Sequence, residues 1–346
     1  MTDYKPHILK VENVDDILNS NSEVVESKYR SMPLFSLGFH QYIHRNNNKL
    51  LDSQLKRKFY LVVNQFEHNI NDNDKDLETI SKKYFGITKD KPEILSRDFY
   101  KLWELLMYFD LLKNDKQINT AHLAECPGSF VQAVMFYREK YFDNKNDNHN
   151  AISLHCDTKE TPEFEKKFLK YYTKNFNVHK TVSEKKSQKS DKDNGDLTNT
   201  KTIENFKKMI NKSKKKIDLV TADGSINKED INYIEQNSYS LILGEIITAL
   251  SIQKKGGNFV LKIFESFTHV TLKYICLLKS LYKDVYICKP LTSRSSDSER
   301  YLVCLDFKLG QQTKIDLVTI KLTNILEKMN KINGNKNFTN DIFTNY

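Results

Sequence analysis

From residue 120 onward the chain alternates short apolar runs with helical segments, and this alternation restricts the fold more than any other feature. It is typical of an α/β protein built on a largely parallel sheet. The seven predicted strands lie at 120–126, 151–156, 176–182, the start of 217–225, 258–264, 285–288 and 301–307. No helix separates the last two, so we expect a doubly wound sheet whose final pair is antiparallel.

Helical patterns fill most of the segments between these strands. The clearest comes earlier, at 97–112, where apolar residues recur three and four positions apart: Phe99, Leu102, Trp103, Leu105, Leu106 and Phe109. The other predicted helices lie at 130–142, 161–174, 203–216, 233–254, 266–281 and 315–329. Lys101 falls in the first half of the helix at 97–112, where a solvated lysine is the ordinary interpretation.

Asp223 ends the buried strand in the stretch IDLVTADGS, immediately before Gly224 and Ser225. In open α/β sheets, ligands bind beyond the carboxyl ends of the strands. We therefore expect Asp223 to face a cleft.

A second strand end carries a tight turn. The strand at 120–126 runs into ECPGSF, with Glu125 before the turn and a predicted helix after Pro127, Gly128, Ser129 and Phe130. The glycine allows close approach of a ligand to the backbone, and the helix start offers free N–H groups. A single glycine disfavours a dinucleotide site, whereas Glu125 suits a ligand with a positive charge. An ordinary strand-to-helix turn is the equal alternative.

Two further acids follow the next strands. Asp157 ends the strand at 151–156, where an acid is placed to bind ribose hydroxyls or to cap the following helix. Asp196 lies in a turn within the polar stretch 183–200, facing either a cofactor or water.

Lys262 lies inside the apolar strand NFVLKIF. A buried ammonium is costly unless it is paired. Asp223 and Glu299 are the available acids. Lys262 is therefore either a member of a structural ion pair or a lysine whose pKa is tuned so that it can accept a proton.

The overall charge favours a polyanionic partner. The chain of 346 residues has 54 Lys and Arg against 45 Asp and Glu, a net charge of +9, which points to nucleic acid first. Its five cysteines form no CxxC pair, so we expect reduced thiols, a cytoplasmic location and no zinc site. No apolar run approaches the length of a membrane span and the N-terminus has no signal-peptide pattern, so no membrane association is expected.

The order Lys101, Asp223, Lys262, Glu299 resembles the Lys-Asp-Lys-Glu tetrad of the FtsJ-like (RrmJ-type) ribose 2′-O-methyltransferases. Six segments between about 95 and 308 carry the resemblance: SRDFYKLWELL, ECPGSF, NGDLTN, ADGS, NFVLKIFES and SSDSERYLV. The wording ECPGSF and the extensions at both ends are closest to the cap-specific mRNA methyltransferases of eukaryotes and large DNA viruses.

This resemblance implies a Rossmann-like methyltransferase fold that uses S-adenosyl-L-methionine and no metal. Lys262 would act as general base, Asp223 and Glu299 would orient the lysines, and Lys101 would hold the hydroxyl or stabilise the oxyanion. The implied cofactor-binding residues are Glu125, Pro127, Gly128, Ser129, Phe130, Asp157, Asp196 and Asp223.

The implied substrate is the 5′ end of capped mRNA, methylated from cap 0 to cap 1, with other capping or transcription proteins as partners and a virus factory or virion as the location if the chain is viral. Methylation of ribosomal or transfer RNA is one alternative, and an RNA-binding accessory subunit on the same fold is another. The predicted organisation is an extension at 1–94 that binds RNA or a partner, the methyltransferase domain at 95–308, and a helix with a mobile tail at 309–346.

Overall fold

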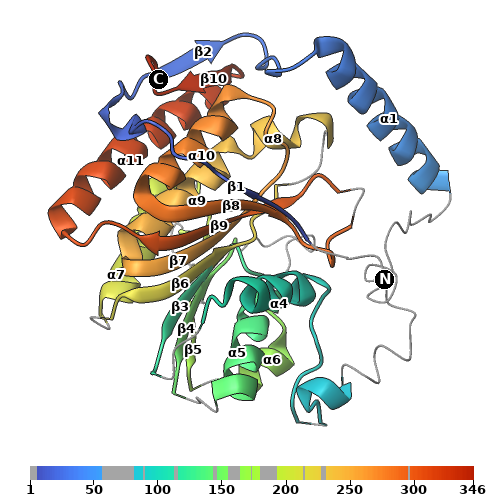
Figure 1. The fold of residues 1–346 in the computed structure, drawn as a ribbon, viewed down its shortest axis with the longest axis vertical. Helices are drawn as coiled ribbons and strands as arrows, with labels where there is room; N and C mark the ends of the chain where they lie inside the picture. The colour runs from blue at the N-terminus through green and yellow to red at the C-terminus, as the bar shows by residue number, and fades with distance from the viewer. Residues whose placement is uncertain are drawn as a thin grey trace.

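The computed structural model describes residues 6–56 (of 50–56 the backbone alone), 82–88, 90–112, 116–142, 146–154, 164–172, 174–179, 193–212, 215–226, 231–294 and 297–346. A twisted central sheet lies between two layers of helices (Figure 1). None of the helices in these ranges is both long and apolar enough to cross a lipid bilayer.

The sheet has eight strands in the order β1-β8-β9-β7-β6-β3-β4-β5. Their bounds are β1 His7–Lys10, β3 Asn119–Leu123, β4 Asn148–Ile152, β5 Phe176–Val178, β6 Ile217–Ala222, β7 Gln253–Ile263, β8 Tyr282–Lys289 and β9 Arg300–Phe307. Strands β3 to β7 are parallel, and β9 runs antiparallel to both β7 and β8. The predicted doubly wound sheet of seven strands is confirmed.

The eighth strand, β1, comes from the N-terminal extension and pairs antiparallel with β8 at the edge of the sheet. Its sequence, HILK, is short and largely exposed. The extension therefore joins the sheet through backbone pairing, which gives no apolar pattern in the sequence.

The helices cover both faces. Their bounds are α1 Leu37–Lys56, α4 Asp98–Phe109, α5 Ser129–Phe142, α6 Lys166–Tyr171, α7 Thr200–Lys212, α8 Ile234–Asn237, α9 Tyr239–Ile252, α10 His269–Leu281 and α11 Gln312–Gly334, with the 3-10 turns η1 Ile17–Asn19 and η2 Ile231–Tyr233. Helices α4 and α5 contribute to one apolar core, and α7, α9, α10 and α11 to the other. Because both faces are covered, strands such as β6 are buried at nearly every position rather than at alternate ones.

The region around residues 238–257 differs from the predicted single helix at 233–254. The helical segment is divided into α8 and α9 at Ser238. Strand β7 then begins at Gln253, five residues before the predicted start, with Gly256 at φ +77° inside it. Gly256 and Gly257 thus lie in the irregular first part of the strand, where the pairing with β6 shifts register.

The end of the chain corrects the expectation of a mobile tail. Strand β10 (Phe338–Ile342) pairs antiparallel with β2 (Val24–Ser27) in a second sheet. Ile342 and Phe343 are 0% exposed. These two apolar side chains anchor a segment that is otherwise rich in asparagine.

The N-terminal extension also contains α1, which lies at one side of the molecule (Figure 1). The stretch at 53–67 has the sequence pattern of an amphipathic helix or a strand, and it falls mostly outside the described residues. Residues 82–85 are helical and end at Gly86.

Candidate active site

The carboxyl ends of β6 and β7, with α4 beside them, bring four charged side chains together. Lys262 Nζ lies 3.1 Å from Asp223 Oδ1 and donates a hydrogen bond of 2.8 Å to the Asp223 carbonyl oxygen. Lys101 Nζ lies 2.6 Å from Glu299 Oε1. Lys101, Lys262 and Glu299 are 6%, 8% and 8% exposed, so both ion pairs are shielded from bulk water.

The two pairs belong to one electrostatic unit. Asp223 also acts on Lys101 through its charge, and Glu299 acts on Lys262. Lys262 is opposite Tyr301 in the pairing of β7 with β9. The Tyr301 hydroxyl donates to Asp223 Oδ1 at 3.3 Å, which fixes the carboxylate from the neighbouring strand.

The cluster shifts the pKa values of its members. Burial raises the pKa of Asp223 to about 6, although Lys262 opposes the shift. For Lys262, burial favours the neutral amine, but the charges of Asp223 and Glu299 outweigh it and raise the pKa. Burial also opposes ionisation of Lys101 and Glu299, yet their mutual attraction wins, so the pKa of Lys101 is raised and that of Glu299 falls to about 2. In the free protein both lysines are therefore charged at neutral pH.

Asp98 was not anticipated from the sequence. Its Oδ1 lies 2.7 Å from Lys101 Nζ, one helical turn away. Ser96 Oγ donates to Asp98 Oδ2 at 3.0 Å and accepts from the Asp98 N–H at 3.1 Å. The i, i+3 spacing of Asp98 and Lys101 was the available signal for this contact.

Side-chain hydrogen bonds hold the described parts of the 290–299 loop, 290–294 and 297–299, and so bring Glu299 to Lys101. Glu104 on α4 accepts hydrogen bonds from Leu291 N, Thr292 N and Thr292 Oγ1, at 2.9, 3.1 and 2.9 Å. Lys289 Nζ donates to Ser293 Oγ and to the Asp297 and Glu299 carbonyl oxygens, at 2.8, 2.7 and 3.0 Å. Ser293 Oγ in turn donates to Glu299 Oε1 at 2.6 Å.

Glu245 is a second unanticipated acid. It is 1% exposed on α9, and its Oε1 accepts from Gly224 N at 3.1 Å. A Cβ at Gly224 would lie 2.3 Å from that oxygen, so a larger residue after Asp223 would displace the Glu245 carboxylate from this position. Burial raises the pKa of Glu245 to about 8, with Lys262 opposing. Nothing in the apolar helix pattern around Glu245 marks it as part of a site.

The turn after β3 lies next to this cluster, because Asp223 N donates to Leu123 O at 3.2 Å. Glu125 Oε1 accepts from Phe130 N and Val131 N, at 2.6 and 3.0 Å, at the start of α5. Gly128 has φ +114°, a conformation that favours glycine.

The remaining residues of this turn are mostly buried. Ser129 Oγ lies 2.8 Å from Ser96 Oγ, Phe130 is 1% exposed in the core, and the Pro127 carbonyl oxygen accepts from Glu165 N. Pro127, Ser129 and Phe130 thus shape the turn through packing and backbone contacts.

Asp196 lies beside the end of β4. A Cβ at Gly195 would lie 2.0 Å from the Ser153 carbonyl oxygen, and Ser153 Oγ accepts from Cys126 N at 3.2 Å. Ser153 therefore joins the turn that contains Asp196 to the turn that contains Glu125. Asp196 Oδ1 accepts from Thr198 N and Oγ1. Asp157 lies outside the described residues.

One orphaned atom tests whether these residues fit S-adenosylmethionine. Glu125 is 3% exposed, and its Oε2 is buried without a hydrogen-bond partner. Burial raises the pKa of Glu125 well above its usual range, although the two backbone N–H donors act to lower it. A cation at Oε2 would satisfy this carboxyl, and the amino-acid end of the cofactor carries an ammonium, so the residues present fit it.

Comparisons with known proteins show which proteins the chain is similar to. The model of the FtsJ-like methyltransferase family matches residues 94–307. A zebrafish (Danio rerio) protein named cap-specific mRNA (nucleoside-2′-O-)-methyltransferase 2 is 30% identical over 234 residues, which is 64% of this chain and 30% of the relative. A probable methyltransferase of African swine fever virus is 30% identical over 217 residues, 61% of this chain and 49% of the viral protein.

A third relative is the mouse (Mus musculus) cap-specific mRNA (nucleoside-2′-O-)-methyltransferase 1, which is 35% identical over 149 residues, covering 42% of this chain and 17% of the relative. The chain thus matches less than half the length of each of these relatives.

Proposed function

The chain belongs to the FtsJ-like methyltransferase family, and on this premise we propose that it transfers a methyl group from S-adenosylmethionine to a ribose 2′-hydroxyl of RNA. We propose that the substrate is the first transcribed nucleotides of capped mRNA, converted from cap 0 to cap 1. Relatives that are named as cap-specific mRNA 2′-O-methyltransferases support this choice of substrate.

The observation that carries the proposal is the pair of buried ion pairs, Lys262–Asp223 and Lys101–Glu299, at the carboxyl ends of the strands. A ribose hydroxyl is a weak nucleophile at neutral pH and needs a nearby group to take its proton. Two lysines are fixed by carboxylates in this site. One can take the hydroxyl proton, and the other can stabilise the oxyanion that forms. Holding the hydroxyl in line with the methyl donor accounts for much of the expected acceleration.

We assign the roles by position. Lys262 accepts the hydroxyl proton, and Asp223 holds its amine through both a side-chain and a backbone oxygen. Lys101 binds the same ribose oxygen, and Glu299 and Asp98 orient the Lys101 ammonium. Because the pKa of Lys262 is raised in the free protein, the amine must lose a proton before it acts as a base. Positive charge and exclusion of water both lower a lysine pKa, and both are expected when the site is filled.

S-adenosylmethionine supplies, when bound, an activated methyl group and a positive charge. Glu125 would bind its ammonium through Oε2, and Gly128 would let it approach the turn. Asp157, Asp196 and Asp223 would hold its remaining polar groups, while Pro127, Ser129 and Phe130 keep the turn in shape.

The proposed partners are the 5′ end of capped mRNA and other capping or transcription proteins. The net charge of +9 supports a nucleic-acid partner. The proposed location is the cytoplasm, or a virus factory or virion if the chain is viral. Cysteine usage without CxxC pairs supports a reducing compartment.

The experiment that tests the proposal compares two RNAs of identical sequence, one capped and one with a 5′-triphosphate, in a tritiated-methyl transfer assay. We expect incorporation into the capped RNA alone. Equal methylation of the uncapped RNA would contradict the capped substrate, and would favour ribosomal or transfer RNA.

A variant separates catalysis from an accessory role. Lys262→Ala is expected to lower kcat about 1,000-fold, within the range lost with a general base. Lys255→Ala is the matched control, because Lys255 is an exposed lysine on the same strand. If Lys262→Ala turns over as fast as the control, the assignment of the base is wrong.

A further inference from the structure

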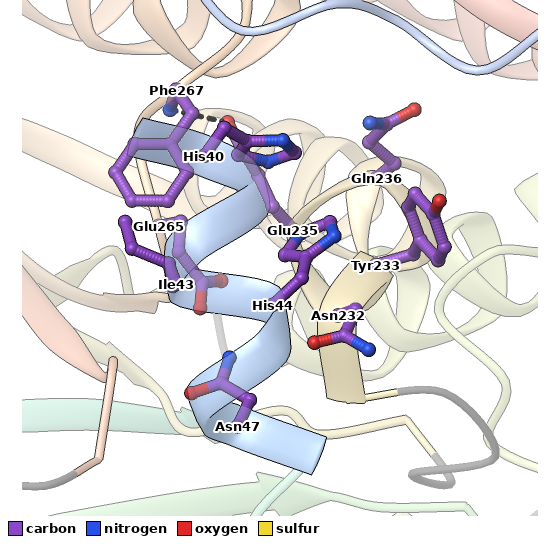
Figure 2. A pocket seen from close by; sticks show the side chains of 10 residues that line it. All are labelled: His40, Ile43, His44, Asn47, Asn232, Tyr233, Glu235, Gln236, Glu265 and Phe267. Atoms are coloured by element: carbon purple, nitrogen blue, oxygen red, sulfur yellow. Dashed lines mark hydrogen bonds between the residues drawn. The ribbon is translucent and has the colours of Figure 1, made fainter. Parts of the chain in front are cut away.

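Helix α1 has two different faces. Figure 2 shows His40, Ile43, His44 and Asn47 pointing from α1 into a pocket that is also lined by Tyr233, Glu235, Glu265 and Phe267. These inner positions are three to four residues apart, as expected for one side of a helix. The opposite side, which we call the outer stripe, consists of Phe39, Tyr42, Arg45 and Lys49.

The inner face packs α1 against the segments that follow β6 and β7 in the chain. Phe35, just before α1, meets Phe267 edge to face, with ring centroids 4.8 Å apart. His44 meets the ring of Tyr233 at 5.4 Å, and Asn232 donates to Asn48 Oδ1 at 2.8 Å. Phe267 follows Lys262 by five positions, and η2 follows the segment that begins at Asp223. The outer stripe therefore lies on a helix that is docked on the segments leading away from the carboxyl ends of β6 and β7.

The outer stripe exposes aromatic rings to solvent. Phe39 is 58% exposed and Tyr42 is 62% exposed. The two ring planes are nearly parallel, at 16°, with centroids 6.3 Å apart. Exposed aromatic rings beside a positively charged track are the usual platform for unpaired bases.

Cations continue the stripe along the same helix. Arg45 and Lys49 are exposed, and at three and seven positions after Tyr42 they lie on its side of the helix. Residues 27–51 contain four Lys or Arg residues and no Asp or Glu. The outer stripe therefore attracts phosphate groups. This favours single-stranded RNA as its partner over an apolar protein surface.

We infer that the outer stripe of α1 binds the single-stranded body of the RNA substrate, downstream of the methylated nucleotide. Bases stack on Phe39 and Tyr42, and the phosphates pair with Arg45 and Lys49. This inference rests on the proposed function, because it assumes that the reacting ribose lies at Lys262.

The test uses the full chain and two capped RNAs, a capped dinucleotide and a capped RNA of about 20 nucleotides. The readout is the ratio of the KM for the long RNA to the KM for the dinucleotide. In the double variant Phe39→Ala with Tyr42→Ala, we expect this ratio to rise about tenfold, within the range that loss of base stacking produces. The double variant Leu317→Ala with Ile320→Ala is the control, because it removes exposed apolar side chains, 69% and 59% exposed, from the distant α11.

An unchanged ratio would overturn the inference. Failure of the proposed function is recognised separately, because the unaltered protein would then methylate neither RNA. If neither RNA is methylated, fluorescence anisotropy with a labelled single-stranded RNA measures binding directly. The inference predicts that the Phe39→Ala with Tyr42→Ala variant binds this RNA more weakly than the unaltered protein, and equal binding would contradict it. The Arg45→Gln with Lys49→Gln variant should reduce the slope of log affinity against log salt by about 1.4, and an unchanged slope would contradict the phosphate contacts.

Discussion

At the scale of single residues, the site consists of charges that are buried only because they are paired. Lys262 and Lys101 each have a carboxylate within 3.1 Å or less. Removing one member of a buried pair usually costs more than the pair itself contributes, since it leaves the partner charge unpaired. The stability of the fold and the geometry of the site therefore depend on the same side chains.

Glu299→Gln is expected to destabilise the protein by about 2 kcal/mol at pH 7, because one neutral acceptor replaces a carboxylate that is bound to Lys101. The pKa of Glu299 is lowered to about 2 in the folded state, so its contribution is present above the unfolded pKa of about 4.5 and is lost as the pH falls toward 2. Urea unfolding should thus show a smaller difference between variant and wild type at pH 4 than at pH 7.

The control is Glu204→Gln, since the Glu204–Lys208 pair is exposed, with side chains 69% and 70% exposed. Such pairs contribute little, so the control should behave like the wild type at both pH values. A Glu299→Gln difference that stays constant between pH 7 and pH 4 would contradict the lowered pKa.

Sequence alone could identify some of these residues and not others. Lys262 was conspicuous as a cation in an apolar strand, and Asp223 as an acid at a strand end. Glu299 stood out as an acid available to Lys262, and Lys101 stood out only through a family resemblance. Ser293 and Glu245 gave no signal, because their contacts are made across the fold by residues that look ordinary in their local sequence.

At the scale of elements, α4 and the 290–299 loop form a unit. Lys101 and Glu104 are three residues apart on α4 and contact opposite ends of this loop. Glu104 therefore acts as a positioning residue for Glu299, without touching the proposed reacting atoms.

Glu104→Ala is expected to lower kcat about tenfold, because the N–H groups of Leu291 and Thr292 lose their acceptor and the loop shifts, and small misplacements in a site cost up to about 100-fold. The KM for S-adenosylmethionine should change less than twofold in steady-state assays. Met107→Ala is the control on the same helix, at a side chain that is 44% exposed. A fall in kcat equal to that of the control would rule out the positioning role.

Most elements were predictable from the sequence, since apolar runs and helical periodicity reflect burial directly. The break between α8 and α9 and the early start of β7 were not, because backbone pairing of Gln253 with Ile217 decides where the strand begins. Strand β1 was missed for the same reason.

At the scale of the whole molecule, a strand of the N-terminal extension pairs with a strand near the C-terminus. Strands β2 and β10 form a separate sheet (Figure 1), and Phe343 packs in the larger core with residues of α10 and α11. No local window of sequence reveals a pairing between segments more than 300 residues apart.

Phe343→Ala is expected to destabilise the protein by about 3 kcal/mol, the usual cost of removing a buried phenylalanine. Chemical denaturation should show this loss, whereas Ile320→Ala, at a side chain that is 59% exposed, should have little effect. If the two variants unfold at the same denaturant concentration, the C-terminal segment does not contribute to the core as described.

The central claim is that the paired lysines act on a ribose 2′-hydroxyl at the start of a capped RNA. Its most direct test is to incubate the protein with S-adenosylmethionine and a capped oligonucleotide, and to map the added mass by nuclease digestion and mass spectrometry. We predict one methyl group on the 2′-oxygen of the first transcribed nucleotide, and none with Lys262→Ala. A methyl group on a base, or equal product from the Lys262→Ala variant, would contradict the account.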